Sequence, residues 1–248
     1  RVMLLVGLPS LVVLAQGETG SVIVIVFMFM VMMYFAGVDL RILLGIAAVG
    51  AIGIGMIVAY GLMAENTDYR ILRLLAFLDP EKYSSSGGYQ IIKSQTAIGA
   101  GQLTGVGTFV ESSWTTLQFV PESSTDSIFS VVGESFGFVG CVAVLLVYLF
   151  IVLRMLYLAR FTNDKFGQLV IVGVMAMLFF HVFQNVAMSI GYMPITGIPL
   201  PFLSYGGSNF ITNIAGVALV LNVTKGRSAA STVAIPLPKI QKRRRRET

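Results

Sequence analysis

Asp126 is the residue whose type and position are best suited to chemistry. It ends a polar run, residues 121–126, directly before a long apolar segment. Two interpretations are open. Ser124, Thr125 and Asp126 are all good N-cap residues, and a carboxylate suits a helix N-terminus. Alternatively, a carboxylate at a lipid boundary accepts a proton from a hydroxyl group and acts as a general base.

Further ionisable and polar groups lie inside apolar segments. Glu134 is two helical turns beyond Asp126, and an ionisable group there is either functional or a partnered structural carboxylate. His181, Gln184 and Asn185 share a helix face by their spacing. This cluster favours hydrogen bonding between helices over a proton path or a metal site. Cys141 is the only cysteine, so neither an internal disulfide nor a cysteine-based metal site is predicted.

Three polar features lie outside these segments. Residues 69–78 place Arg70 and Arg73 on one face among leucines, which predicts a helix in the membrane interface. This helix either serves as a simple anchor or binds lipid phosphate groups through its arginines. The glycine cluster at 99–107 matches no phosphate-binding fingerprint, so we expect a flexible turn. Glu18 precedes an apolar segment and either caps it or lines a cavity.

The composition decides the class of protein. The chain is 56% hydrophobic and 12% charged, with a mean hydropathy of +0.83; soluble domains carry about 25% charged residues. A polytopic bundle of membrane helices is therefore predicted. It should be all-α, because lipid offers no hydrogen-bond partners and each span must satisfy its own backbone N–H and C=O groups. The six predicted spans are Val2 to Ala15, Ser21 to Ala36, Ile42 to Met63, Ile128 to Leu153, Phe166 to Ile190 and Asn209 to Val223.

Charge asymmetry predicts the orientation. The turn after the fourth span and the tail at 225–248 are basic, whereas residues 64–127 are rich in acidic residues. By the positive-inside rule the tail is cytoplasmic, and residues 64–127 form a large outer loop of one membrane domain, 1–224. The Pro-rich segment 191–207 folds back over the outer mouth of the bundle. The terminal basic run is interpreted as a lipid-facing anchor, not a nucleic-acid site.

Small residues recur at helical spacing in two of the spans. One stripe lies at positions 47, 51, 55 and 59, and the other at 133, 137, 140 and 143. We expect both stripes to allow tight helix packing. The chain starts inside an apolar segment with no signal-peptide pattern, so we expect an N-terminal part to be missing.

Two long motifs closely resemble signatures of the SEDS family (shape, elongation, division and sporulation), which includes RodA, FtsW and SpoVE. They are QFVPESSTDSIFSVVGESFGFVG at 118–140 and GIPLPFLSYGGS at 197–208. Weaker similarities are YQIIKSQTAIGAG at 89–101, QGETG at 16–20 and LDP at 78–80. The sequence departs from the family pattern at Ser127, where Phe is usual, at Ser135, where Glu is common, and in the 16–20 turn.

The resemblance implies a bacterial plasma-membrane protein of ten spans, of which these are the last six. It implies a peptidoglycan glycosyltransferase that uses lipid II and works with a class B penicillin-binding protein. Asp126 matches the catalytic acidic residue of the family. A lipid II flippase and a non-catalytic scaffold for the transpeptidase are the alternatives.

Polymerisation would expel an anionic pyrophosphate, so cations must offset its charge. Arg70, Arg73 and Lys93 are candidates, and a divalent cation, Mg or Mn, is the alternative. Further candidates for substrate binding are the polar residues of the two long motifs, namely Glu122, Glu134, Ser204 and Ser208.

Overall fold

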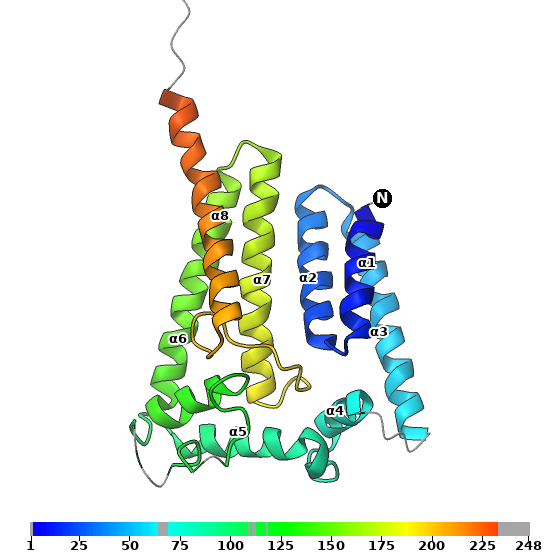
Figure 1. Cartoon of the computed structure of the whole chain (residues 1–248), viewed down its shortest axis with the longest axis vertical. Helices are drawn as coiled ribbons and strands as arrows, with labels where there is room; N and C mark the ends of the chain where they lie inside the picture. The colour runs from blue at the N-terminus through cyan, green and yellow to red at the C-terminus, as the bar shows by residue number, and fades with distance from the viewer. Residues whose placement is uncertain (1, 64–68, 109, 111–112, 118, 233–248) are drawn as a thin grey trace, which may run out of the picture.

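The protein folds entirely into helices in the part of the chain that the structure, a computed structural model, describes. Residues 2–63, 69–108, 110, 113–117 and 119–232 are described. Figure 1 shows the helices in chain order. They are α1 (Val2–Ala15), α2 (Thr19–Phe35), α3 (Leu40–Met63), α4 (Tyr69–Leu78), the short π-helical turn η1 (Ser84–Gly88), α5 (Tyr89–Ala100), α6 (Ile128–Arg160), α7 (Lys165–Ser189) and α8 (Gly207–Thr232).

Six of these helices match the six predicted spans. Helices α6 and α7 and residues Gly207–Lys225 of α8 are long and apolar enough to cross a membrane. Residues Val6–Ala15, Thr19–Phe35 and Leu40–Gly53 form shorter apolar helical stretches in the described part of the chain. Helix α8 runs on to Thr232, past the predicted start of the tail at 225, and residues 233–248 lie outside the described part.

Helix α7 is the centre of the bundle, because it packs against α6, α2 and α8. Its buried residues Ile171, Val172 and Met175 form one apolar cluster with Met155 of α6 and Val220 of α8. The Asp164 carboxylate caps the start of α7 by accepting hydrogen bonds from the backbone N–H groups of residues 166 (3.3 Å) and 167 (2.9 Å). The helix that carries His181, Gln184 and Asn185 is therefore held on three sides.

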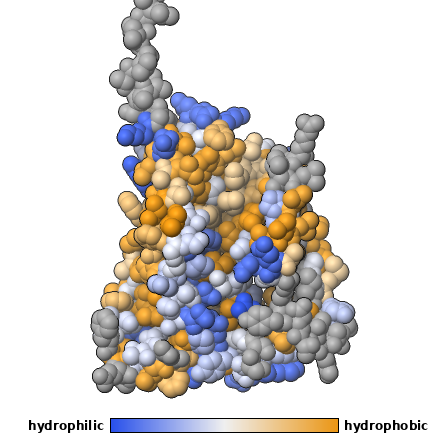
Figure 2. Space-filling model, viewed as in Figure 1, coloured by the Kyte–Doolittle hydropathy of each residue, from blue (hydrophilic) through white to orange (hydrophobic). Residues whose placement is uncertain are grey.

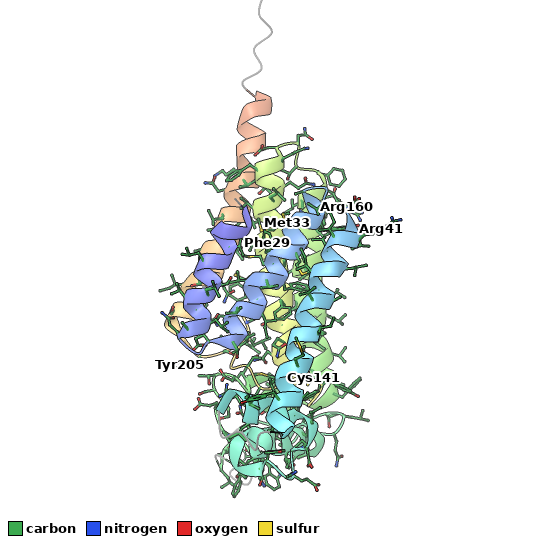
Figure 3. All side chains as sticks on the ribbon, turned by 90° about the vertical axis from the view of Figure 1, so that its right-hand side faces the viewer. Phe29, Met33, Arg41, Cys141, Arg160 and Tyr205 are labelled. Carbon is green, nitrogen blue, oxygen red and sulfur yellow. The ribbon has the colours of Figure 1, made fainter. Side chains whose placement is uncertain are left out.

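The two ends of the bundle differ in what they carry. The α1–α2 turn, α4, α5 and the Pro-rich segment lie at one end, and the α2–α3 and α6–α7 turns lie at the other (Figure 1). Arg41 of α3 and Arg160 of α6 share that second end (Figure 3). In Figure 2, hydrophobic surface covers much of the flanks, while hydrophilic residues gather toward the ends. This distribution is that of a bundle crossing a hydrocarbon layer.

The glycine cluster at 99–107 packs closely on a break in α6. Gly137 leaves the helical conformation (φ 65°, ψ −163°), and the backbone N–H groups of Phe138 and Val139 donate to the carbonyls of Gln102 (2.8 Å) and Leu103 (3.1 Å). A Cβ atom on Gly105 would overlap the carbonyl of Ser135. The expectation of a flexible turn is therefore wrong: these glycines allow two backbones to touch.

The small-residue stripe of α3 behaves differently from that of α6. Its residues at 47, 51, 55 and 59 are exposed in the described structure, and a Cβ atom built on its one glycine, Gly55, would meet no atom of the described residues within 4 Å. Helix α3 contacts α4 and, more sparsely, α2. The predicted tight packing is thus present at Gly133 and Gly137 of α6 but absent along α3 in the described chain.

Candidate functional site

The two long motifs meet at Asp126, where the loop before α6 touches the Pro-rich segment. The Asn185 side chain of α7 donates to the carbonyl oxygens of both Asp126 and Ile198, each at 2.8 Å. Ser204 donates to the carbonyl of Thr125 (2.6 Å) and accepts from the N–H of Leu200 (2.7 Å). The backbone on both sides of the carboxylate is therefore fixed by hydrogen bonds from distant parts of the chain.

The Asp126 side chain does not cap α6. The helix begins at Ile128 with Ser127 as its N-cap residue, and Ser127 Oγ instead accepts from Gln90 Nε2 of α5 (3.0 Å). The Asp126 carboxylate is half-buried, and the neighbouring Thr125 hydroxyl donates to Glu122 Oε2 (3.1 Å). Its Oδ2 lies 3.3 Å from where a Cβ of Gly197 would stand. In the described chain, no helix N–H groups satisfy this carboxylate as they do at Asp164.

The surroundings of Asp126 raise the pKa of its carboxyl group. Burial is the largest cause, because it disfavours the charged form, and the nearby charge of Glu122 adds to it. Arg73 and the neighbouring Thr125 hydroxyl act in the opposite direction, and Glu18 makes a smaller raising contribution. A carboxylate with a raised pKa in a partly desolvated position is a stronger proton acceptor than an exposed one.

A mostly apolar pocket of about 240 Å³ with a few polar side chains includes Gly197, which lies next to this carboxylate. It is lined by Glu18 and Ser21 at the start of α2, by His181 of α7, and by Thr196 and Gly197 of the Pro-rich segment, with apolar neighbours. The Glu18 side chain makes no capping hydrogen bond to α2. Of its two interpretations from sequence, lining a cavity is the one that the structure supports.

The other candidate residues fall into two groups. Glu122 and Arg73 lie close enough to Asp126 to act on its charge. Arg70 belongs to α4, but its side chain is outside the described part of the structure. Ser204 is buried and both its hydrogen bonds are internal, whereas Ser208 is exposed at the start of α8.

Lys93 of α5 and Glu134 of α6 belong to a second polar junction, between the segment that follows α5 and α6. Both Glu134 oxygens accept backbone N–H groups, from Trp114 at 2.6 Å and from Thr115 at 2.9 Å, and the residue is 1% exposed. The Lys93 ammonium lies over the ring of Trp114 (4.8 Å) and over that of Phe119 (5.8 Å). This geometry fits the structural interpretation of Glu134, which pins the loop to α6.

Asn185 is the residue whose role the spacing alone did not reveal. Its i, i+3, i+4 relation to His181 and Gln184 predicted hydrogen bonding between helices, but its partners are loop carbonyls of both motifs. Gln184 likewise donates to the carbonyl of Pro194 (3.2 Å). The signal available in sequence was an amide inside an apolar helix, which must find a buried partner.

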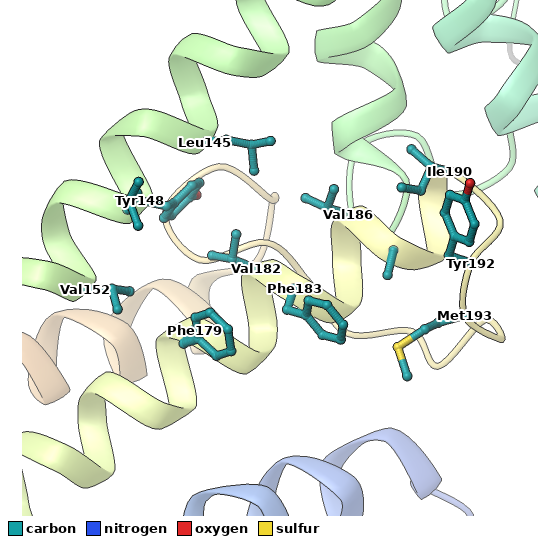
Figure 4. A pocket seen from close by; sticks show the side chains of 12 residues that line it. Leu145, Tyr148, Val152, Phe179, Val182, Phe183, Val186, Ile190, Tyr192 and Met193 are labelled. Carbon is teal, nitrogen blue, oxygen red and sulfur yellow. The ribbon is translucent and has the colours of Figure 1, made fainter. Parts of the chain in front are cut away.

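An apolar groove of about 670 Å³ runs along the other side of α7. Its walls come from α6 and α7, and Tyr192 and Met193 close one end (Figure 4). The Tyr148 hydroxyl donates to the carbonyl of Pro201 and thereby ties α6 to the Pro-rich segment. The groove offers apolar contact but few polar groups, so it is distinct from the pocket beside Asp126.

The described residues contain no cluster of three or more His, Cys, Asp or Glu side chains that could hold a metal ion. The divalent cation therefore stays a prediction, and no chemical step is assigned to it below.

Comparison with known proteins identifies relatives along most of the chain. The family model described as "Cell cycle protein", covering FtsW, RodA and SpoVE, matches residues 1–229. The peptidoglycan glycosyltransferase MrdB of Escherichia coli (strain K12) is 35% identical over 229 residues, 92% of this chain and 60% of that protein. The peptidoglycan glycosyltransferase RodA of Treponema pallidum is 41% identical over 155 residues, 62% of this chain and 36% of that protein.

Two solved structures are also similar. One belongs to a peptidoglycan synthase complex that coordinates polymerization and crosslinking; it is 32% identical, with a TM-score of 0.69, over 91% of this chain and 60% of that one. The other is an aspartate-to-alanine variant of the rod shape determining protein RodA of Thermus thermophilus. It is 28% identical, with a TM-score of 0.57, over 90% of this chain and 54% of that one.

This chain spans about 60% of the length of MrdB. The resemblance seen in the two long motifs is confirmed by a match that runs through the six apolar helices and both motifs. The chain is thus part of a membrane protein, and it belongs to the FtsW, RodA and SpoVE family of cell cycle proteins.

Proposed function

We propose that the protein containing this chain is a peptidoglycan glycosyltransferase that polymerises lipid II, with Asp126 as its general base. The observation that carries the proposal is the state of Asp126: a half-buried carboxylate with a raised pKa that caps no helix, on a backbone whose carbonyls accept hydrogen bonds from Asn185 and Ser204. The names of the relatives support the same activity.

In the proposed reaction, Asp126 removes the proton from the 4-hydroxyl of the acceptor sugar. The oxygen attacks the anomeric carbon of the lipid-linked donor and forms the new glycosidic bond. The bond from that carbon to the pyrophosphate breaks, and undecaprenyl pyrophosphate leaves with the electron pair. Arg73, whose charge acts on Asp126, is the described cation best positioned to offset the leaving group. Arg70, Lys93 and a divalent cation stay candidates for the same task.

The test compares two aspartates that differ in their surroundings. Asp126→Asn in the full-length protein should abolish polymerisation of lipid II, since an amide has no useful basicity and positioned acid–base catalysis supplies about 100- to 10,000-fold. Asp164 is the matched control, because it caps α7 and Asn is an equally good N-cap. Asp164→Asn should therefore retain polymerisation.

Polymer formed from purified protein and lipid II is measured at matched amounts, with melting temperatures taken in parallel. Near-normal polymerisation by Asp126→Asn would reject the catalytic assignment. A wild-type protein that moves lipid II across vesicles but forms no polymer would favour the flippase, and one that does neither would favour the scaffold.

We further propose a plasma-membrane orientation with the α6–α7 turn and the C-terminus in the cytoplasm, and a class B penicillin-binding protein as partner. The basic residues Arg154, Arg160 and Lys165 support the orientation. Single cysteines at the exposed positions Thr104 and Asn163, in a protein otherwise free of cysteine, test it in intact cells. An impermeant thiol reagent should label Thr104→Cys but not Asn163→Cys; the reverse pattern would overturn the orientation.

A further inference from the structure

We propose that the end of the bundle at the α6–α7 turn binds an anionic phospholipid, with Arg154 and Arg160 of α6 at its phosphate group and the apolar face of α6 along its acyl chains. Helix α6 begins two residues after Asp126 and ends at Arg160, so this site lies at the other end of the bundle from the proposed general base. The lipid is a bound neighbour of the protein and takes no part in the proposed glycosyl transfer.

One face of α6 points away from the bundle along the second half of the helix. In the described chain, the buried residues Met155 and Ala159 pack against α7 and α8 on the opposite face. Large side chains recur on the outer face at helical spacing and are 52% to 69% exposed, namely Leu146, Phe150, Leu153, Tyr157 and Phe161. In a helix that crosses a membrane, such an outer face lies against lipid acyl chains.

Basic side chains gather where this apolar face ends. Arg154 and Arg160 stand three residues before and after Tyr157, so they flank its ring on the helix surface, and Lys165 follows at the start of α7. All three are exposed, and among the described residues none of them forms an ion pair. The carboxylate of Asp164, the one acidic residue between positions 154 and 165, accepts two N–H groups of α7.

An aromatic pair supports the first of these arginines. The guanidinium carbon of Arg154 lies 5.3 Å from the centre of the Tyr157 ring, and the Tyr157 and Phe161 rings are 4.6 Å apart. A guanidinium held over a ring still has N–H groups to pair with two phosphate oxygens. Aromatic and basic residues at the end of a span are typical of the depth at which lipid headgroups lie.

Helix α8 adds a fourth cation at this end of the bundle. A Cβ on Gly167 of α7 would come within 2.6 Å of Val223, so α8 lies directly against the start of α7. The exposed Lys225 is two residues further along α8, where its apolar stretch ends. Each basic residue near a membrane surface contributes about 5-fold to the affinity for anionic lipid, so this set favours an anionic over a zwitterionic headgroup.

A phospholipid matches both halves of the surface at once. Free phosphate would meet the cations but leave the outer face of α6 uncovered, and a soluble acidic protein would do the same. A lipid places its phosphate beside Arg154 and Arg160 and its chains along Phe150 and Leu153. In the orientation proposed above, this end of the bundle meets the cytoplasmic leaflet, in which anionic lipids are concentrated.

The experiment measures lipid binding to the full-length protein in detergent. Phosphatidylglycerol is titrated, and bound lipid is counted by native mass spectrometry; phosphatidylcholine with the same acyl chains is the comparison. Phosphatidylglycerol should bind more tightly. Arg154→Gln and Arg160→Gln should each weaken its binding about 5-fold, and the two together about 25-fold. Arg41→Gln is the matched control and should bind as wild type, because Arg41 is exposed at the same end (Figure 3) but lies on α3, which packs on α4 and α2.

Tyr157 tests the aromatic support independently of the charges. Tyr157→Phe keeps a ring beneath Arg154 and should bind phosphatidylglycerol as wild type does. Tyr157→Leu removes the ring while staying apolar, and should weaken binding about 2- to 5-fold. Equal affinity in these two variants would overturn the role given to the ring.

Three results would overturn the lipid site itself. The first is equal affinity of the wild-type protein for the two phospholipids, and the second is unchanged affinity when both arginines are replaced. The third is displacement of phosphatidylglycerol by an equal concentration of inorganic phosphate, which would indicate a site for a free anion. Because the readout is binding, Asp126→Asn should leave it unchanged, so a failure of the glycosyltransferase proposal would not be mistaken for a failure of this one.

Discussion

Replacing Asn185 with alanine tests whether a single amide holds Asp126, the proposed general base, in place. The Asn185 Nδ2 group is the donor for two carbonyls, that of half-buried Asp126 and that of buried Ile198, both at 2.8 Å. Alanine removes both hydrogen bonds at once. Because the site is closed, each carbonyl loses a partner that water cannot readily replace.

The magnitude follows from these two orphaned groups. A buried polar group left unsatisfied costs about 1–3 kcal/mol, so the variant should lose about 2–6 kcal/mol of unfolding free energy. The effect on activity has a different origin. The bond fixes the backbone of the general base, and a shift of about 1 Å at a reacting group costs on the order of 100-fold in rate.

The assay needs a variant that loses a similar number of bonds elsewhere. Asn213 of α8 is equally buried, and its Nδ2 donates to the backbone and side-chain oxygens of Asn209 at 2.8 and 2.7 Å, within its own helix. Both alanine variants should melt at lower temperature in detergent. Only Asn185→Ala should lose about 100-fold in lipid II polymerisation when assayed well below its melting temperature.

Two outcomes of the comparison would refute the reasoning. If both variants lose activity in proportion to their loss of stability, Asn185 is an ordinary buried amide and does not position Asp126. An Asn185→Ala protein with wild-type polymerisation would refute the reasoning directly.

Three further perturbations follow from the same contacts. Because Asp126 must be ionised to act as a base, activity should fall as pH drops through the raised pKa of Asp126. Glu122→Gln removes a nearby negative charge and so lowers that pKa. The acid limb of the pH–rate profile should therefore move to lower pH in this variant. An unmoved limb would contradict this coupling. Gly137→Ala should lower the melting temperature, since the residue has φ +65° and a Cβ would strike the Leu103 carbonyl. Gly53→Ala of α3 is the control and should leave the melting temperature nearly unchanged, because no described atom lies within 4 Å of a Cβ there. Equal effects of the two substitutions would refute the packing of the 99–107 segment on α6. Glu134→Gln leaves one acceptor for two N–H groups and should cost about 1–3 kcal/mol in stability while retaining polymerisation, and a folded but inactive variant would show that Glu134 must ionise.

The sequence by itself predicted the helices and singled out Asp126, the proposed general base. A run of apolar residues in lipid must satisfy its backbone within its own segment, so local composition suffices to predict a helix. The boundaries of the predicted spans agree with the helices within a few residues, except where α6 and α8 continue to Arg160 and Thr232. The two motifs likewise singled out Asp126 before any coordinates were needed.

Tertiary structure alone decided between the interpretations that the residues left open. Whether the Asp126 carboxylate caps α6 depends on Asn185 and Ser204, which hold the backbone beside it and are 59 and 79 residues from their partners in the first motif. The same holds for Glu134, whose partners are 20 and 19 residues away in the segment between α5 and α6. Hydrogen bonds at such separations are set by how helices pack, and helical periodicity, which extends only over a few turns, carries no information about them.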